Sequence, residues 1–242
     1  MQFIEVTELA GVRSAVVRFR RRGSGLSFVI FPMVHLGERS FYDQVTARLR
    51  ALCDLVIAEG IRGESPSAAA LTQSYRRLDG SERLGLVVQD IDYRALGVPV
   101  VCPDMTGEEF ESRWRRVPLR ERAAVAALVP VYATGMRLLG TRRFMARHLR
   151  TEDLLTDTEE AAAGVMTGMD DVILHRRDRL LLDAVKELHR ARGDHKEPYT
   201  IGIVYGAEHM RAVAPALADL GYHTADSEWL TVFALDPPHA RP

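Results

Sequence analysis

Short apolar runs alternate with amphipathic segments along the chain, a pattern typical of an α/β fold. Six runs of apolar or alternating residues predict strands, at residues 2–8, 13–20, 26–32, 55–58, 98–102 and 200–205. Apolar residues recur at helical spacing between several of these runs, so helices should cover the faces of the sheet. We therefore predict an α/β (α+β) fold with a central mixed sheet flanked by helices, forming one domain over residues 1–235.

The stretch from residue 26 to residue 59 predicts a strand, a loop that carries a histidine, a helix and a second strand. The first apolar run ends at Pro32, and His35 follows three residues later. Ser40, with Asp43 three positions on, predicts the start of the helix. The second apolar run ends at Glu59. Because open α/β sheets bind ligands where the carboxyl ends of neighbouring strands meet, His35 and Glu59 are expected to share one crevice.

The same order of elements recurs near the end of the chain. The strand-like run 200–205 is followed by Gly206-Ala207-Glu208-His209, a helix-like segment and a second apolar run. We interpret this as a degenerate internal duplication of two strand–His loop–helix–strand halves. It predicts that His35 and His209 occupy equivalent loops and lie in one crevice.

Composition narrows the class of protein. The 242 residues are 47% hydrophobic and 27% charged, which is ordinary for a globular protein. A net charge of −1 argues against a dedicated nucleic-acid binder. Cys53 and Cys102 lie in or beside apolar runs, and the absence of a CxxC pair excludes a zinc ribbon or a thioredoxin-like site. The N-terminal residues show no signal-peptide pattern, so a cytoplasmic protein is expected.

The apolar run Ala123–Gly140 approaches the ~20 residues of a membrane span, and arginine-rich stretches flank it. Pro130, Gly135 and Arg137 interrupt the run, so we predict no transmembrane segment. The favoured interpretation is a helix buried against the sheet or against a second subunit, which makes a homodimer plausible. The alternative is a peripheral membrane contact supported by the flanking arginines. The proline-rich residues 236–242 predict a disordered tail.

Four ionisable residues fall at predicted strand ends: His35, Glu59, Asp104 and His209. Two histidines with carboxylates suit a divalent metal such as zinc, manganese, cobalt or iron, which would activate a bound water. Without a metal, one histidine can act as a general base that a carboxylate orients. Each histidine taken singly is also explained as a hydrogen-bonded structural residue. Arg177, in the run HRRDR of a predicted long helix, is either an exposed helix residue or a clamp for an anion.

Several motifs together resemble the TraB/PrgY, GumN and Tiki proteins. They are MVHLGERSFYDQV…DLVIAEGI, QDIDY…VVCPDMTGEEF, the RRD of the long helix, and YGAEHM. That group belongs to a broader superfamily with the haem-uptake protein ChaN and erythromycin esterase. The resemblance spans roughly residues 28–235. It implies a site made of two G-x-x-H histidines, a glutamate, an arginine and a recurrent aspartate, which correspond to His35, His209, Glu59, Arg177 and Asp104.

Two departures from the family pattern are visible. Pro32 stands where the first G-x-x-H motif has glycine, so the backbone there lacks an N–H and has a fixed φ. Glu208 stands beside His209 where the family has a small residue, and its carboxylate could supply an additional ligand.

The resemblance implies three possible functions. The first is a metal-dependent hydrolase of an amide, peptide or ester bond, in which His35, Glu59 and His209 hold the metal, Arg177 stabilises the oxyanion and Asp104 orients a ligand or water. The second is a haem- or small-ligand-binding protein of the ChaN type, with a histidine or with Tyr42 or Tyr205 as axial ligand. The third is a non-catalytic binder of a peptide or partner.

Overall fold

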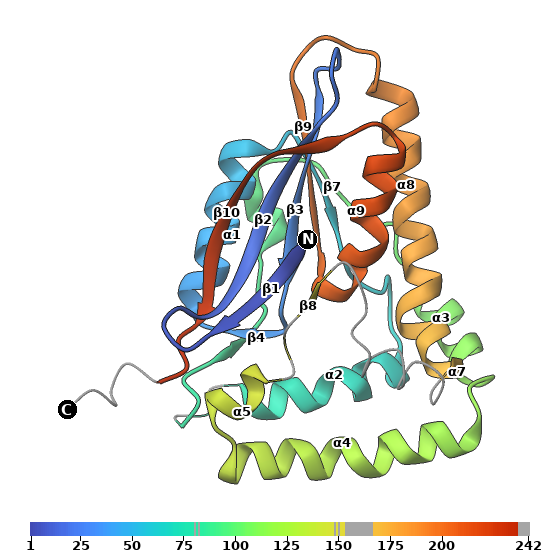
Figure 1. Ribbon diagram of the computed structural model, residues 1–242. Coiled ribbons are helices and arrows are strands. Elements are labelled where there is room, and N and C mark those ends of the chain that lie inside the picture. Colours follow the sequence, from blue (N-terminus) through green and yellow to red (C-terminus); the bar gives the residue numbers. More distant parts are fainter. Residues whose placement is uncertain (80, 82, 148, 150, 153–166, 237–242) are drawn as a thin grey trace.

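A computed structural model of the chain describes all residues except 80, 82, 148, 150, 153–166 and 237–242, so the predicted tail lies almost wholly outside the described part (Figure 1). Eight strands form one sheet in the order β7-β5-β9-β3-β2-β1-β8, with β10 paired to β2. The strands are β1 (Gln2–Thr7), β2 (Gly11–Arg20), β3 (Leu26–Met33), β5 (Leu55–Ala58), β7 (Val100–Val101), β8 (Thr151–Glu152), β9 (Tyr199–Gly206) and β10 (His223–Phe233). A separate ladder joins β4 (Leu36–Gly37) to β6 (Val87–Val88). This mixed sheet, with helices on its faces, confirms the predicted fold class.

The helices follow the amphipathic segments of the sequence. The α-helices are α1 (Arg39–Leu52), α2 (Pro66–Leu78), α3 (Gly107–Trp114), α4 (Leu119–Leu139), α5 (Arg142–Ala146), α7 (Thr167–Asp170), α8 (Arg176–Arg192) and α9 (Met210–Asp219). Three shorter segments are η1 (Tyr93–Leu96), the π-helical η2 (Asp171–His175) and η3 (Ala207–His209). The first of these α-helices begins at Arg39 after Glu38, so the cap predicted at Ser40 is wrong.

Four strands of the sheet run parallel, and the predicted site residues follow their carboxyl ends. β9 lies between β3 and β5, and β7 pairs with the other edge of β5. All eight residues of β3 are buried because helices or loops cover both faces of the sheet there. The carboxyl ends of the four parallel strands therefore meet along one edge of the sheet.

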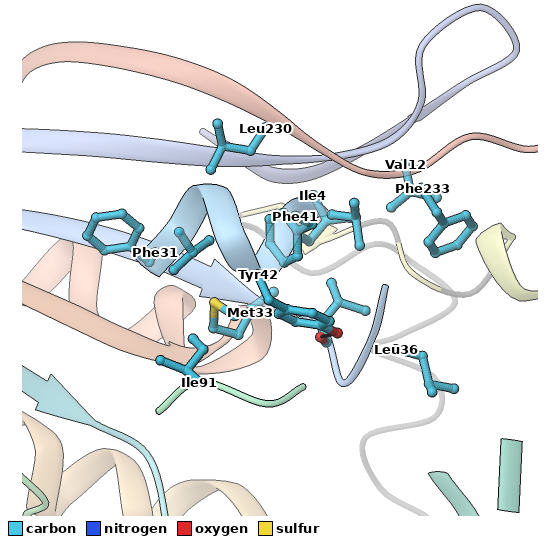
Figure 2. Close-up of a cluster of buried hydrophobic side chains, with 14 of the residues drawn as sticks. Ile4, Val12, Phe31, Met33, Leu36, Phe41, Tyr42, Ile91, Leu230 and Phe233 are labelled. Atoms are coloured by element: carbon cyan, nitrogen blue, oxygen red, sulfur yellow. Dashed lines mark hydrogen bonds between the residues drawn. The ribbon is translucent and has the colours of Figure 1, made fainter. Parts of the chain in front are cut away.

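Two hydrophobic cores lie on opposite faces of the sheet. The first packs α1, through Phe41, Val45 and Leu49, against residues such as Phe31 of β3 (Figure 2). The second packs α8 and α9 against side chains of the opposite face, including Phe28. The two halves predicted from the sequence thus have the same order of elements, β3–His35–α1–β5 and β9–His209–α9–β10, with their helices on opposite faces.

The apolar run at residues 123–140 lies mostly within α4, at the bottom of the view in Figure 1. This helix packs on α2 rather than on the sheet. Leu128 and Val131 leave 65% and 70% of their surface exposed. Burial of this helix against the sheet is therefore wrong, because α2 covers only one side of it, while burial against a second subunit remains a prediction. Among the described residues no helix is long and apolar enough to cross a membrane.

Candidate active site

The predicted site residues follow the carboxyl ends of the four parallel strands. His35 comes two residues after β3, Glu59 directly after β5, and Asp104 three residues after β7, while His209 ends η3 after β9. α8 runs alongside and contributes Arg177. The shared direction of the strands brings segments that are far apart in sequence to one edge of the sheet, as expected for an open α/β fold.

Arg177 joins two carboxylates that come from neighbouring strand ends. Its Nε donates to both oxygens of Asp104, at 2.9 and 3.1 Å, and its Nη2 lies 2.8 Å from Oε1 of Glu59. Asp104 is fully buried and also accepts hydrogen bonds from the backbone N–H groups of Gly60 and Met105. The guanidinium is thereby fixed in place, and its pKa is raised, chiefly because these carboxylate contacts outweigh burial. Arg177 is a clamp rather than an exposed helix residue.

His209 is held from both sides of its ring. Nδ1 lies 2.6 Å from Oδ1 of Asp178, and Nε2 lies 3.6 Å from Oε1 of Glu59. The ring of Tyr205 packs edge-on against it, with centroids 5.3 Å apart. Only 4% of His209 is exposed. A carboxylate on Nδ1 fixes the orientation of the imidazole and aims Nε2 at Glu59.

Gly206, three residues before His209, lies against the carboxylate of Glu59. Its N–H donates to Oε2 of Glu59 at 2.6 Å. A Cβ added at Gly206 would lie 3.3 Å from that same oxygen, closer than ordinary van der Waals contact. The absent side chain lets the carboxylate of Glu59 approach the backbone directly.

Glu59, Asp104, Arg177, Asp178 and His209 form a largely buried cluster, and their contacts determine which of its groups are charged. Burial raises the pKa of Glu59, but the contacts with His209 and Arg177 outweigh it and hold that pKa well below its usual range. Burial lowers the pKa of His209, but Asp178 and Glu59 reverse the effect and raise the pKa to about 9. At neutral pH Glu59 is therefore negative, and Arg177 and His209 are positive. Each charge has an opposite charge beside it.

His35 differs from the residues of the cluster because it is exposed to solvent. Desolvation by the surrounding chain lowers the pKa of His35; Glu59 opposes this shift, while the positive charges of Arg177 and His209 add to it. The pKa of His35 thus responds to the charges of Glu59, Arg177 and His209, and the crevice shared by His35 and His209 remains a prediction. At neutral pH it is an uncharged imidazole at the solvent-facing side of a buried group of charges.

The metal predicted on His35, Glu59 and His209 can be tested against this arrangement. The 3.6 Å between Nε2 of His209 and Oε1 of Glu59 is a distance that one ion with ~2.1 Å bonds can span. However, Arg177 already contacts Oε1 of Glu59, and His209 is held protonated. In the described part of the chain no three His, Cys, Asp or Glu side chains are grouped to hold a metal. A metal held by these three residues therefore remains a prediction.

The three additional candidates fall in different places. The hydroxyl of Tyr42 donates to the backbone carbonyl of Val34 inside the first core. Tyr205 is fully buried, and its hydroxyl has no hydrogen-bond partner among the described residues. Glu208 is exposed and pairs with Arg211 of α9. Both tyrosines are buried, and an axial tyrosine for a haem remains a prediction.

Two residues near the cluster were not predicted from the sequence. Asp178 orients His209, and it is the aspartate of the RRD motif, adjacent to the arginine that was singled out. The hydroxyl of Tyr93, in η1, is buried, and burial raises its pKa, with a further contribution from the negative charge of Glu59. Tyr93 is the last residue of the QDIDY motif, but no role was predicted for it, because it lies in a short segment outside the predicted strands.

Comparisons with protein-family models, with curated proteins and with solved structures find no match to this chain. The resemblance to the TraB, GumN and Tiki proteins therefore remains a prediction from short motifs.

Proposed function

We propose that the cluster around Glu59 is the active centre of a hydrolase that cleaves an amide, peptide or ester bond. The observation that carries the proposal is an uncharged, solvent-exposed His35 beside a buried cation, Arg177, that two carboxylates hold rigidly. Hydrolysis needs a base for water and a fixed positive charge for the developing oxyanion. His35 and Arg177 would supply these two groups at the edge of the sheet where the parallel strands end.

In the proposed reaction His35 accepts a proton from a water molecule as the water oxygen attacks the carbonyl carbon of the substrate. The carbonyl π bond breaks, and the negative charge moves to the carbonyl oxygen. Arg177 stabilises that oxygen through Nη1, the guanidinium nitrogen that neither Asp104 nor Glu59 uses and that donates only to the carbonyl of Ile173, at 3.5 Å, among the described residues. When the intermediate collapses, the bond to the leaving group breaks and protonated His35 returns its proton to the leaving nitrogen or oxygen. Water is thereby added across the scissile bond, and the enzyme is regenerated.

The remaining residues hold this geometry. Asp104 anchors Arg177, and Asp178 keeps His209 against Glu59. His209, charged at neutral pH, helps keep Glu59 ionised so that Glu59 can share Arg177 with Asp104. A cation that is already paired and immobile costs little reorganisation when the oxyanion forms.

The test is a panel of p-nitrophenyl esters and amino-acid p-nitroanilides assayed with wild-type protein and with Glu59→Gln. We expect turnover of at least one class, and its loss in the variant. Turnover that is equal in the two proteins across the panel would show that the cluster is not the catalytic centre. Far-ultraviolet circular dichroism of both proteins controls for misfolding.

A further inference from the structure

The outer face of α4 exposes large apolar side chains that nothing in the described part of the chain covers. α4 lies along the margin of the molecule, with α2 on its inner side (Figure 1). Leu128, Val131 and Leu139 are 65%, 70% and 77% exposed, and Leu119 at the start of the helix is 74% exposed. No charged side chain occurs between Ala123 and Met136. An exposed apolar surface of this length marks an interaction site.

The charges around this face have one sign. Exposed arginines lie at both ends of the apolar stretch: Arg115, Arg116, Arg120, Arg137 and Arg147. Between Arg115 and Arg147 the sequence contains a single carboxylate, that of Glu121. Glu121 is buried and accepts a hydrogen bond from the N–H of Met169, so it faces inward. The outer surface of α4 is therefore apolar in the middle and positively charged at both ends.

A second copy of the chain does not match this surface. Antiparallel pairing of two α4 helices would bring Arg120 of one copy near Arg137 of the other, and parallel pairing would set each arginine near its equivalent. Like charges that face each other across an interface destabilise it. A negatively charged surface with an apolar layer beneath it matches both parts of the pattern.

We propose that the outer face of α4 binds the surface of an anionic phospholipid membrane. The helix lies parallel to the membrane plane, with Leu128 and Val131 inserted among the upper acyl chains and the flanking arginines paired with lipid phosphates. Nucleic acid offers phosphates as well, but it has no apolar layer to receive the exposed leucine and valine side chains. The proposal is independent of the hydrolase function.

The experiment is cosedimentation with vesicles made of equal parts phosphatidylglycerol and phosphatidylcholine, and with pure phosphatidylcholine vesicles. Wild-type protein is expected to bind the anionic vesicles and to be released from them by salt. Replacing two arginines, Arg120→Gln with Arg137→Gln, should lower the partition coefficient about 25-fold, because each charge near an anionic membrane contributes about 1 kcal/mol. The double variant Leu128→Asp with Val131→Asp should lower it roughly tenfold or more.

Matched controls use exposed positions elsewhere on the molecule. Leu9→Asp, at the turn between β1 and β2, and Arg20→Gln with Arg22→Gln should leave binding unchanged. Thermal unfolding of each variant checks that it is folded. The proposal is overturned if wild-type protein binds anionic vesicles no better than neutral ones, or if the α4 variants bind as well as wild type. It is also overturned if sedimentation without lipid shows a dimer that Val131→Asp dissociates, since α4 would then be a contact between copies.

Discussion

Arg177 and Asp104 lie 73 residues apart in the sequence, yet the Nε of the arginine lies 2.9 and 3.1 Å from the two carboxylate oxygens of the aspartate. This buried pair connects α8 to the loop after β7. Through this pair, Arg177 of the charged run in α8 is held in the cluster at the strand ends. The cluster therefore depends on contacts between elements that are remote in sequence, and removing one partner should have measurable consequences.

Asp104→Asn should lower the free energy of unfolding by about 3 kcal/mol, because it removes the charge of one partner from a buried ion pair. The pair Arg48–Glu228 offers a matched control, since it is also bidentate but lies at the surface. Glu228→Gln should cost less than about 1 kcal/mol. Urea unfolding measures both values. Similar losses in the two variants would mean that the Arg177–Asp104 pair is no more important than a surface pair.

The stability of the protein should depend on pH through His209. Its pKa is about 9 in the folded protein, above the ordinary value of 6.5, so its contribution is complete below pH 6.5 and is lost as the pH rises through 9. The expected loss is roughly 3 kcal/mol. It should be absent in His209→Gln, which serves as the control for other titrating groups. Urea unfolding of both proteins between pH 6 and pH 10 measures the difference, and parallel curves would contradict the assignment.

Asp178→Asn tests whether Asp178 positions His209. The neutral amide removes the charge that raises the pKa of His209, so the pH at which His209 loses its proton should fall. Nuclear magnetic resonance of the imidazole of His209 in the folded protein measures that pKa directly. An unchanged value would show that Asp178 is only a packing neighbour. Asp183→Asn, elsewhere on the same helix, is a suitable control.

Arg177→Lys should lower kcat roughly 100-fold while KM changes little, if Arg177 acts on the developing oxyanion. Lysine keeps the charge but cannot hold two carboxylates and the oxyanion at once, because it lacks the planar fork. Arg48→Lys is the control at an exposed bidentate pair. The role is contradicted if KM rises and kcat stays unchanged, since that pattern reports lost substrate binding alone.

Chelation tests the predicted metal. As placed, Arg177 contacts the Glu59 oxygen that a metal would use, so activity should survive removal of divalent ions. Elemental analysis and thermal unfolding with added manganese, cobalt, zinc or iron accompany the assay. If activity is lost and one ion restores both activity and thermal stability, the metal-dependent hydrolase is correct. An absorption spectrum with a Soret band would instead support the haem alternative.

The positions of the site residues could be predicted because strand ends are visible in the sequence. The apolar runs before His35, Glu59 and Asp104 end abruptly, and parallel strands bring such ends together. Arg177 could be assigned to the site only through the resemblance to the TraB, GumN and Tiki proteins. The role of Asp178 could not be predicted, because a single sequence does not show which face of α8 meets η3.

The surroundings of α4 could not be predicted from the sequence either. The apolar run correctly predicts a helix, but the same pattern suits a helix that is covered on all sides and one that is covered on a single side. Only the arrangement of α2 and α4 decides between them. Likewise, Ser40 has the residue type of a cap, but the chain enters α1 one residue earlier, at Arg39. Boundaries of this kind depend on the preceding loop rather than on the helix itself.

The most direct test of His35 as the general base is the hydrolysis rate of His35→Ala with and without added imidazole. We expect a rate roughly 10²–10⁴-fold below wild type, the usual contribution of a general base. Because His35 is exposed, imidazole can enter the vacated space and should restore part of the rate. His223→Ala, which removes another exposed histidine, should match wild type. A His35→Ala protein that hydrolyses every substrate at the wild-type rate would contradict the proposed mechanism.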